Sequence, residues 1–578
     1  MRGTRFIILY GSQTGTAEDV AGRIARYAKR RRFHVTISGM DDYPVTELIT
    51  EELVLFVCAT TGQGEEPDNM KSFWTFLLRK TLPSTSLTSM QYGVIGLGDS
   101  SYLKFNFTAK RLHRRLAQLG ARALAEPVYA DDQHEFGPDG MIDSWVENFL
   151  RILEYKYPLP SGLTVISDDV LEPAKYELEQ QTVCTSDMCV VDCRAFLSPL
   201  LENRRVTSSS HFQDVRLLRF STKGFDIQFE PGDVVMIQPE NAEEDVSEFL
   251  RLLDLDPNIV WKIRSLSGPL PPLLSQPITV QKCAVKYFDL SYIPKRSFFE
   301  IFWHFAEDEL EKAKLREFGT TAGQEDLVDY VVRPRRTVLE VLADFPHTTP
   351  RIPHQYLFDL IPPIRPRPFS IASSLRVHPD EIHVLVAVVE FRTKLQKPRR
   401  GLCSNFLARL DARRDTVVPV RVRKGLLRMP SDESPVLMVG PGTGCAPFRG
   451  FIQDRCSRNL PQNVLFFGSR NKAGDFFFKE EWSELVRRGQ LHLVTAFSRD
   501  QDHKVYVQHR ILEEKDKVIS SVANGATIYI AGNAKDMVPD VRSALREVLQ
   551  DLAGPAEDGE AILKKLERQH RLQIEAWS

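Results

Sequence analysis

Long hydrophobic runs are missing from this sequence of 578 residues. No segment approaches the roughly 18 to 20 consecutive apolar residues that a membrane-spanning helix needs. The first apolar run, Phe6–Tyr10, is short and leads directly into a glycine loop, so it predicts a strand and not a signal peptide. We therefore expect a cytoplasmic protein that has no membrane partner.

A strong charge of either sign is also absent. The chain has 75 Lys and Arg against 77 Asp and Glu, a net charge of −2. Such a balance favours neither nucleic acid nor a membrane surface as a partner.

Cysteine is scarce, and the eight cysteines are too few and too scattered for a disulfide framework. Cys184, Cys189 and Cys193 lie close together, which leaves open either a metal or redox site or a plain reduced linker. The spacing of a four-ligand zinc site is absent, and no histidine lies within the cluster. We predict no metal site.

A chain of this length is too long for one hydrophobic core, so several domains are expected. Residues 1–153 alternate short apolar runs with helical patterns, which predicts a doubly wound α/β domain with a parallel sheet. The expected strands are Phe6–Tyr10, Leu53–Ala59 and Tyr92–Leu97, and the expected helices are Ala17–Arg31 and Asn106–Leu119.

Residues 154–195 contain a proline-rich, polar stretch and are expected to form a linker. Residues 196–430 combine strand patterns with a helical stretch, which predicts a β-barrel with a helical insert at about 243–346. From residue 431 to residue 578 the strand–glycine loop–helix rhythm returns, so a second parallel sheet is expected. The protein is thus predicted to be a multidomain α/β protein.

A glycine loop follows the first strand and opens a helix. Its hydroxyl and backbone N–H groups, with the helix dipole behind them, form a cradle for a phosphate. The lysine of nucleoside triphosphate loops is missing, which favours a monophosphate. Glycines at two later strand ends allow a flat ring to approach the backbone, and a tyrosine can stack on it. The candidate residues are Ser12, Gln13, Thr14, Gly15, Thr16, Ala17, Ala59, Thr60, Thr61, Gly62, Gly64, Leu97, Gly98, Asp99, Tyr102, Phe105 and Asn106.

Residues 5 to about 153 resemble flavodoxin-type FMN domains, with Ser12 to Ala17 matching the phosphate loop. Asp131 and Asp132 fall where such domains have a third flavin loop, although a solvated turn is an equal alternative. Thr61 stands where many relatives have an aromatic residue. Glu65, Glu66 and Asp68 near these loops are candidates for steering a basic partner.

The segment Arg367-Pro368-Phe369-Ser370 resembles the Arg-x-aromatic-Ser motif of the ferredoxin-reductase superfamily. There the arginine binds the FAD pyrophosphate, the ring packs on the flavin, and the serine lies near the atom that receives hydride. Phe369 replaces the usual tyrosine. The second pyrophosphate element of that superfamily is matched by Gly401, Leu402, Cys403 and Ser404. The alternative is that Arg367 is a surface charge and Phe369 a core residue.

Another glycine loop, with Gly442, Thr443 and Gly444, follows an apolar strand and precedes a helix, which is typical of a dinucleotide site. Cations, hydroxyls and an amide gather downstream, as a ribose with a 2′-phosphate requires, so NADPH is predicted over NADH. These donors are Ser498, Arg499, Lys504, Tyr506 and Gln508.

The segment Ala531–Met537 resembles the Cys-Gly-Asp-x-x-x-Met element near the nicotinamide, with Ala531 for the thiol and Asn533 for the carboxylate. Asp536 within it is a candidate cofactor contact. The chain ends Glu575-Ala576-Trp577-Ser578, which resembles the terminal acid-x-Trp of diflavin reductases. The resemblance implies that Ser370 and Glu575 assist hydride transfer and that Trp577 covers the flavin. A tryptophan that merely fills a groove is the alternative.

Taken whole, the chain resembles the diflavin reductase family over nearly its full length. The resemblance implies an oxidoreductase that passes electrons from NADPH to FAD to FMN and then singly to another protein. The features closest to one branch imply cytosolic iron–sulfur cluster assembly, with an anamorsin-type iron–sulfur protein as acceptor. These features are the lack of a membrane anchor, the Ala59–Gly64 segment, the Asp131–Glu135 turn and Phe369. The alternatives are a methionine-synthase or sulfite reductase flavoprotein and a non-enzymatic NADPH-binding scaffold.

Overall fold

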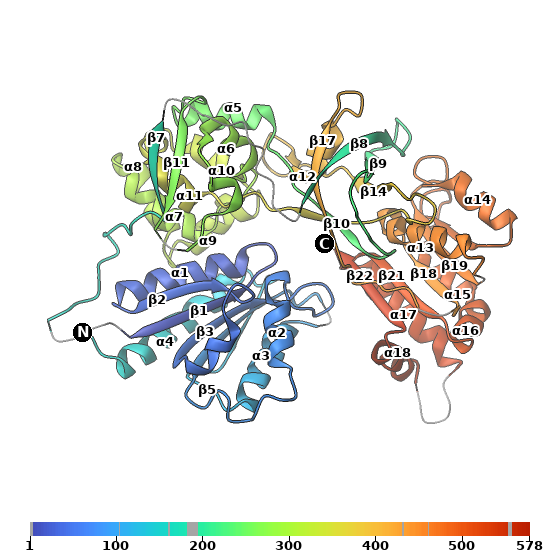
Figure 1. Ribbon diagram of the computed structural model, residues 1–578, viewed down its shortest axis with the longest axis horizontal. Coiled ribbons are helices and arrows are strands. Elements are labelled where there is room, and N and C mark those ends of the chain that lie inside the picture. The colour runs from blue at the N-terminus through green and yellow to red at the C-terminus, as the bar shows by residue number, and fades with distance from the viewer. Residues whose placement is uncertain are drawn as a thin grey trace.

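The computed structural model describes residues 4–102, 104–159, 162–181, 195–266, 268–430, 433–460, 462–552 and 558–577. The cluster of Cys184, Cys189 and Cys193 lies outside these ranges. Figure 1 shows an amino-terminal sheet covered by helices, a helical region beside it, and a parallel sheet at the opposite end of the molecule. An antiparallel sheet lies between the helical region and the carboxyl-terminal sheet.

The amino-terminal sheet has the order β2-β1-β3-β4-β5, with β6 also paired to β4, and all its pairs are parallel. Helices α1 and α4 share one apolar core with the sheet, and α2 and α3 share the other, so the predicted doubly wound arrangement is confirmed. The elements are β1 Arg5–Gly11, α1 Thr16–Arg30, β2 His34–Gly39, 3₁₀ helices Val45–Thr50 and Asp68–Met70, β3 Leu53–Ala59, α2 Lys71–Leu77, β4 Gln91–Gly98, α3 Phe107–Gln118, β5 Arg122–Ala123, β6 Val128–Asp131 and α4 Asp139–Lys156.

The helical region has the largest apolar core of the described residues. A small antiparallel sheet, β12-β11-β7, lies on it, and β7 (Tyr176–Gln181) comes from within the predicted linker. The other elements are α5 Glu243–Leu252, β11 Val260–Ser265, 3₁₀ helix Pro272–Leu274, β12 Ile278–Thr279, α6 Val280–Lys286, α7 Arg296–Phe302, 3₁₀ helix Trp303–Phe305, α8 Glu309–Phe318, α9 Gln324–Leu327, π-helix Val328–Val332, α10 Val338–Asp344, 3₁₀ helices Thr349–Arg351 and His354–Tyr356, and α11 Leu357–Leu360.

Within the predicted helical insert, the chain leaves helical geometry between Phe305 and Glu309. Helix α8 begins at Glu309. Asp308 is its N-cap, because the Asp308 carboxylate accepts hydrogen bonds from the N–H groups of Leu310 and Glu311. The helical region also continues beyond the predicted limit of about residue 346, up to Leu360.

The antiparallel sheet has the order β13-β10-β17-β8-β9-β14. Its two edges meet at one isolated bridge, between Ile371 and Val384, so the strand set expected of a barrel is present without a continuous closing ladder. Helix α12 packs on its apolar core. The elements are β8 Phe196–Arg205, β9 Val215–Ser221, β10 Val234–Ile237, β13 Arg367–Ser370, β14 Glu381–Ala387, β15 Glu390–Phe391, β16 Arg399–Arg400, α12 Leu402–Arg409 and β17 Val417–Arg423.

The carboxyl-terminal sheet is parallel, as predicted, with the order β20-β19-β18-β21-β22. Its last strand, β22 (Leu572–Trp577), is not anticipated from the sequence, since it is short and only partly buried. The other elements are β18 Val436–Val439, 3₁₀ helix Gly442–Gly444, α13 Cys445–Ser457, β19 Asn463–Ser469, α14 Lys479–Arg487, β20 His492–Phe497, α15 Val507–Glu513, α16 Lys515–Ala523, β21 Thr527–Asn533, α17 Met537–Gln550 and α18 Gly559–Arg568.

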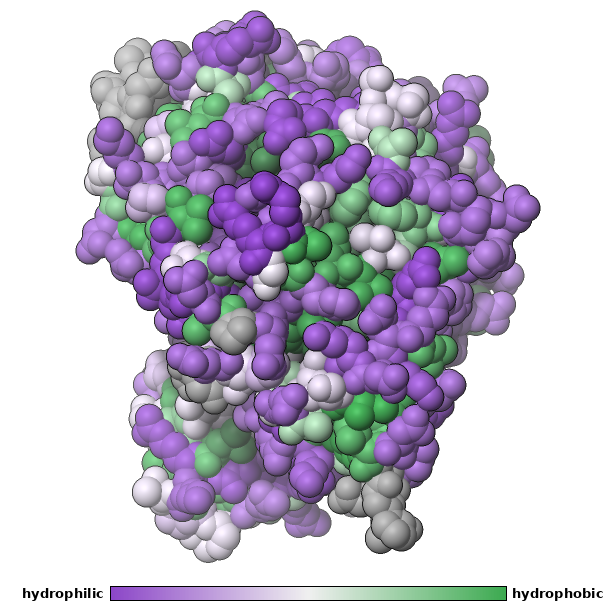
Figure 2. Space-filling view, turned by 90° about the vertical axis from the view of Figure 1, so that its right-hand side faces the viewer, coloured by the Kyte–Doolittle hydropathy of each residue, from purple (hydrophilic) through white to green (hydrophobic). Residues whose placement is uncertain are grey.

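The carboxyl-terminal domain is fixed to the antiparallel sheet by Arg449 on α13. Its guanidinium donates to the Ala372 carbonyl oxygen (2.8 Å), to His383 Nδ1 (3.0 Å) and to Glu481 (2.8 Å). The face of the molecule in Figure 2 is mostly hydrophilic, with smaller hydrophobic areas between the polar ones. In the part of the chain described, every helix is too short or too polar to cross a membrane.

Candidate functional site

The phosphate loop between β1 and α1 is braced by its own side chains and by a neighbouring segment. Ser12 Oγ accepts a hydrogen bond from the Gly15 N–H (3.0 Å), and the Ser12 N–H donates to Asn69 Oδ1 (2.7 Å). The Gln13 amide donates to Asp68 (2.8 Å). The first N–H groups of α1 have no acceptor within the helix, and a phosphate is suited to accept from them.

Gly15 has a φ of +101°, where glycine is favoured, and a Cβ there would lie 3.2 Å from the Arg365 guanidinium. We expect Gly15→Ala to weaken FMN binding about tenfold, because a left-handed alanine costs roughly 1–2 kcal/mol. The measurement is the FMN and FAD content of the purified full-length protein. Gly22→Ala is the control, since a Cβ at Gly22 in the same helix meets no atom within 4 Å. Normal FMN content in Gly15→Ala would contradict the assignment of the loop.

The loops predicted to bind the ring lie together at the carboxyl ends of β3, β4 and β6. The Thr60 N–H donates to the Leu97 carbonyl (2.9 Å), and the Asp132 N–H donates to the Gly98 carbonyl (2.8 Å). Asn106 is fully buried and its amide donates to the Ala130 carbonyl (2.9 Å), while its Oδ1 has no hydrogen-bond partner among the residues that the structure describes. The structure thus gathers the predicted loops around one place, with Tyr102 half-buried beside them.

Two predicted loop residues already have internal partners for their side chains. Thr61 Oγ1 donates to the Glu65 carbonyl (3.1 Å) within a turn, so this hydroxyl braces the loop. The Asp131 carboxylate accepts from the Ser100 and Gln133 N–H groups (2.9 and 3.0 Å), hydrogen bonds that hold its pKa below the usual value despite some desolvation. Asp132 next to it is exposed.

The acidic side chains near these loops are not presented to a partner. Glu66 pairs with Arg111 (2.7 Å), and Asp68 pairs with Arg423 on β17 and with Lys71 (2.8 Å). Glu65 accepts from the Gln63 N–H (2.5 Å), and burial raises its pKa. The steering role considered for these three residues therefore has no support in the structure.

One cavity of about 2700 Å³ is lined by both the phosphate loop and the residues predicted to bind FAD. Ordinary small-molecule pockets have about 300–1,000 Å³, so this space suits more than one cofactor or a large dinucleotide. Its lining includes Thr14, Gly15, Thr16, Arg367, Phe369, Gly401, Leu402, Cys403 and Ser404.

The pyrophosphate residues are held in place by local hydrogen bonds. Arg367 donates to the Arg365 carbonyl (2.8 Å) and stays partly exposed toward the cavity. Ser404 Oγ accepts from the Val389 N–H (3.0 Å), which fixes α12 at its Gly401 N-cap. The cavity, the partly exposed arginine and the helix start together fit an FAD pyrophosphate.

The residues predicted to assist hydride transfer meet across two domains. Ser370 Oγ on β13 donates to Glu575 Oε2 on β22 (3.0 Å), and Glu575 lies in register with Ala531 on β21. Loss of solvent raises the pKa of Glu575 to about 7, against the lowering effect of Ser370 and Arg423. Trp577 lies in register with Asn533, and 38% of its surface is exposed. Hydrogen-bonded to a hydroxyl, a carboxyl with such a pKa can change charge near neutral pH.

The dinucleotide loop requires glycine for both conformation and space. Gly442 has a φ of +57°, and a Cβ at Gly444 would lie 2.1 Å from the Ala531 carbonyl oxygen. Thr443 lies between them in the 3₁₀ turn that precedes α13. The close approach of the loop to β21 therefore depends on Gly444.

The donors predicted for the 2′-phosphate lie at and after the carboxyl end of β20. Arg499, Lys504 and Tyr506 are exposed, whereas Ser498 is buried and its N–H donates to the Ser469 carbonyl (2.9 Å). Ser469 Oγ is buried without a partner among the described residues, as expected where a ligand supplies one. The sequence alone does not predict this serine at the end of β19, because a single Gly-Ser pair is too common to indicate a site.

The two remaining predicted cofactor contacts lie near the start of α17. The Gln508 amide donates to Asp540 on α17 (3.0 Å). Asp536 is exposed at the start of α17, next to Asn533, whose side chain accepts from the Lys535 N–H (2.8 Å). The Asn533 side chain thus stabilises the turn that leads into α17.

One group of described residues, His378, Glu381 and His383, has ligand atoms close enough to share a metal ion. Glu381 pairs with Arg219 (2.8 Å) and with His383 (2.7 Å), and Arg449 donates to His383. These two arginines supply the positive charge that a metal would bring, so the group is a polar junction between domains.

Comparison with known proteins gives three matches in chain order. Residues 8–145 match the model described as flavodoxin, residues 190–406 the FAD binding domain, and residues 438–543 the oxidoreductase NAD-binding domain. The chain is 50% identical to NADPH-dependent diflavin oxidoreductase 1 of Xenopus laevis, with 99% of each chain covered. It is 48% identical to the Bos taurus protein of the same name (100% of each covered) and 36% to that of Arabidopsis thaliana (99% of each).

Proposed function

Since the chain belongs to the NADPH-dependent diflavin oxidoreductase 1 family, we propose that it reduces an anamorsin-type iron–sulfur protein and so serves iron–sulfur cluster assembly in the cytosol.

The chain is an oxidoreductase with FMN, FAD and NADPH sites, and the predicted family, reaction class and cofactors are confirmed. When bound, these groups carry electrons from NADPH to FAD to FMN and convert a two-electron hydride donor into a one-electron source. The protein binds and orients them. The Ser370–Glu575 pair lies at the junction of the FAD and NADPH domains, and the Ser12–Ala17 loop lies in the FMN domain.

The proposal depends chiefly on FMN being the last carrier of the relay, held in a domain of its own beside the FAD and NADPH domains (Figure 1). FMN can release its electrons one at a time, and a metal cluster accepts electrons one at a time, so the two are matched as donor and acceptor. The Ala59–Gly64 loop, the Asp131–Glu135 turn and Phe369 favour the iron–sulfur branch of the family.

Delivery to a partner requires the FMN domain to move, because its phosphate loop faces the cavity shared with the FAD residues. The segment after α4 runs along α1, where the Ile166 N–H donates to the Arg30 carbonyl (2.9 Å) and Arg30 pairs with Asp168 (2.6 Å). These surface contacts are weak enough to break during such a motion.

The test is anaerobic mixing of the NADPH-reduced protein with an oxidised anamorsin-type [2Fe–2S] protein, followed by the absorbance of the cluster. We expect cluster reduction at least tenfold faster than by free reduced FMN at equal concentration, because docking orients donor and acceptor. Methionine synthase, the haem subunit of sulfite reductase and cytochrome c are the competing acceptors. Faster reduction of methionine synthase or the sulfite reductase subunit than of the cluster would overturn the proposal in favour of that acceptor.

A further inference from the structure

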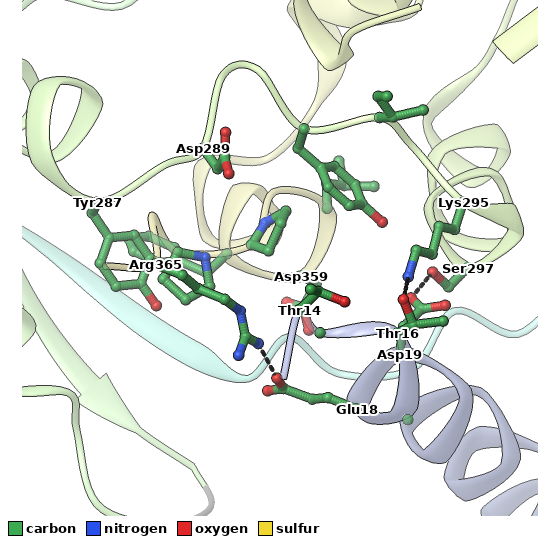
Figure 3. A pocket seen from close by; sticks show the side chains of 18 of the residues that line it. Thr14, Thr16, Glu18, Asp19, Tyr287, Asp289, Lys295, Ser297, Asp359 and Arg365 are labelled. Carbon is green, nitrogen blue, oxygen red and sulfur yellow. Dashed lines mark hydrogen bonds and ion pairs between the residues drawn. The ribbon is translucent and has the colours of Figure 1, made fainter. Parts of the chain in front are cut away.

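Two cations from outside the FMN domain lie against its phosphate loop. Lys295, just before α7, donates from Nζ to Thr16 Oγ1 (2.9 Å), and Arg365, just before β13, pairs with Glu18. Figure 3 shows both side chains pointing from the helical region toward the start of α1. An added Cβ at Gly15 would lie 3.2 Å from Arg365 Nη2, so the guanidinium touches the loop itself.

The phosphate loop offers hydrogen-bond donors to a phosphate but no positive side chain of its own. Residues Ser12–Ala17 include no cation, and the first turn of α1 carries Glu18 and Asp19. Carboxylates at this place repel a phosphate dianion. In the structure both are neutralised or bonded from across the domain boundary, Glu18 by Arg365 and Asp19 by the Ser297 hydroxyl (Figure 3).

Lys295 also lacks an anion of its own. Its ammonium donates to the Thr16 hydroxyl and forms no ion pair with any residue in the described part of the chain. Desolvation lowers its pKa, although the charges of Asp19 and Asp139 oppose this effect. An ammonium held out of water without a paired anion is costly, so an anionic ligand at this place would be stabilising.

We propose that Lys295 and Arg365 complete the FMN phosphate site from the other side of the domain boundary, so that FMN binding and docking of the FMN domain stabilise each other. The coupling is reciprocal by thermodynamic necessity: if docking tightens FMN binding, bound FMN favours the docked state by the same factor. When the domain swings out, the phosphate loses both cations. The flavin is then held mainly by its own domain.

Other contacts hold the two parts together without using the phosphate. Glu300 on α7 accepts from Arg26 (2.6 Å) and from the Tyr27 hydroxyl (2.5 Å), and Arg296 pairs with Asp143 on α4. Docking therefore persists when FMN is absent. The phosphate adds to an interface that already exists.

The experiment compares FMN with riboflavin, which has the same ring and no phosphate. Flavin is titrated into full-length protein that has been depleted of FMN but keeps FAD, and binding is followed by flavin fluorescence. We expect Lys295→Met and Arg365→Gln each to weaken FMN binding about tenfold, and the double variant about a hundredfold, while riboflavin binding stays unchanged. Lys286→Met is the matched control, since Lys286 pairs with Glu240 on the surface of the same region and lies outside the phosphate loop.

Lys295→Arg keeps the positive charge and is expected to retain most of the FMN affinity. Comparing it with Lys295→Met separates the loss of charge from misfolding. Hydrogen exchange of α1 and α7 supplies a second readout: FMN, but not riboflavin, is expected to slow exchange in the wild type, and in the double variant neither does. Equal losses for FMN and riboflavin, or no loss for either, would overturn the proposal. Neither readout involves an acceptor protein, so its failure is distinguishable from failure of the proposed function.

Discussion

Replacing Arg499 and Lys504 together with alanine is expected to lower kcat/KM for NADPH about a hundredfold or more, with little change for NADH. Both cations are exposed after β20, beside the buried Ser498. A hydrogen bond to a charged group contributes about 1.5–3 kcal/mol, so two of them together account for about 3 kcal/mol or more. NADH has no 2′-phosphate and does not use them.

The measurement is steady-state reduction of an artificial acceptor with each nucleotide over a range of concentrations. Lys517→Ala serves as the control, because Lys517 is an exposed cation on α16, outside the predicted site. An equal fall with both nucleotides would mean that the two cations support the fold and not the selectivity. Unchanged NADPH kinetics would show that Arg499 and Lys504 do not bind the 2′-phosphate.

The rate of FAD reduction by NADPH is expected to rise with pH through an apparent pKa of about 7, the value to which burial raises Glu575. Above it the carboxylate accepts the Ser370 hydrogen bond. A carboxylate at this place would stabilise the positive charge that a bound nicotinamide gains when it gives up hydride. Below it the neutral carboxyl offers no such stabilisation, so the rate falls as the pH falls.

Glu575→Gln is expected to abolish this pH dependence and to lower the rate above neutral pH about a hundredfold, in the range of lost electrostatic stabilisation at other active sites. Ser370→Ala removes the hydroxyl and leaves the carboxylate, so its pH profile should persist at a reduced rate. Anaerobic stopped-flow absorbance of the flavins gives both profiles. A titration near pH 7 that survives in Glu575→Gln would assign it to another group.

Much of the site follows from local sequence. The Ser12–Ala17 loop, the Arg367–Ser370 segment and the Gly442–Gly444 turn each bring their donors together within a few residues, so strand patterns and glycines predict them. The order of the three sheet domains follows in the same way from runs of apolar residues. The terminal strand β22 is too short and too exposed to be predicted, and it gains stability only by pairing with β21.

The sequence by itself thus determined the kinds of domain, their cofactors and the loops predicted to bind them, because the periodicity of strands and helices and the chemistry of phosphate loops are local properties. Only the tertiary structure decided which residues meet across domain boundaries: Ser370 with Glu575, Lys295 with Thr16, and Arg365 with Glu18. The physical reason is that partners separated by hundreds of positions are brought together by the packing of whole domains. No spacing rule along the chain encodes that packing.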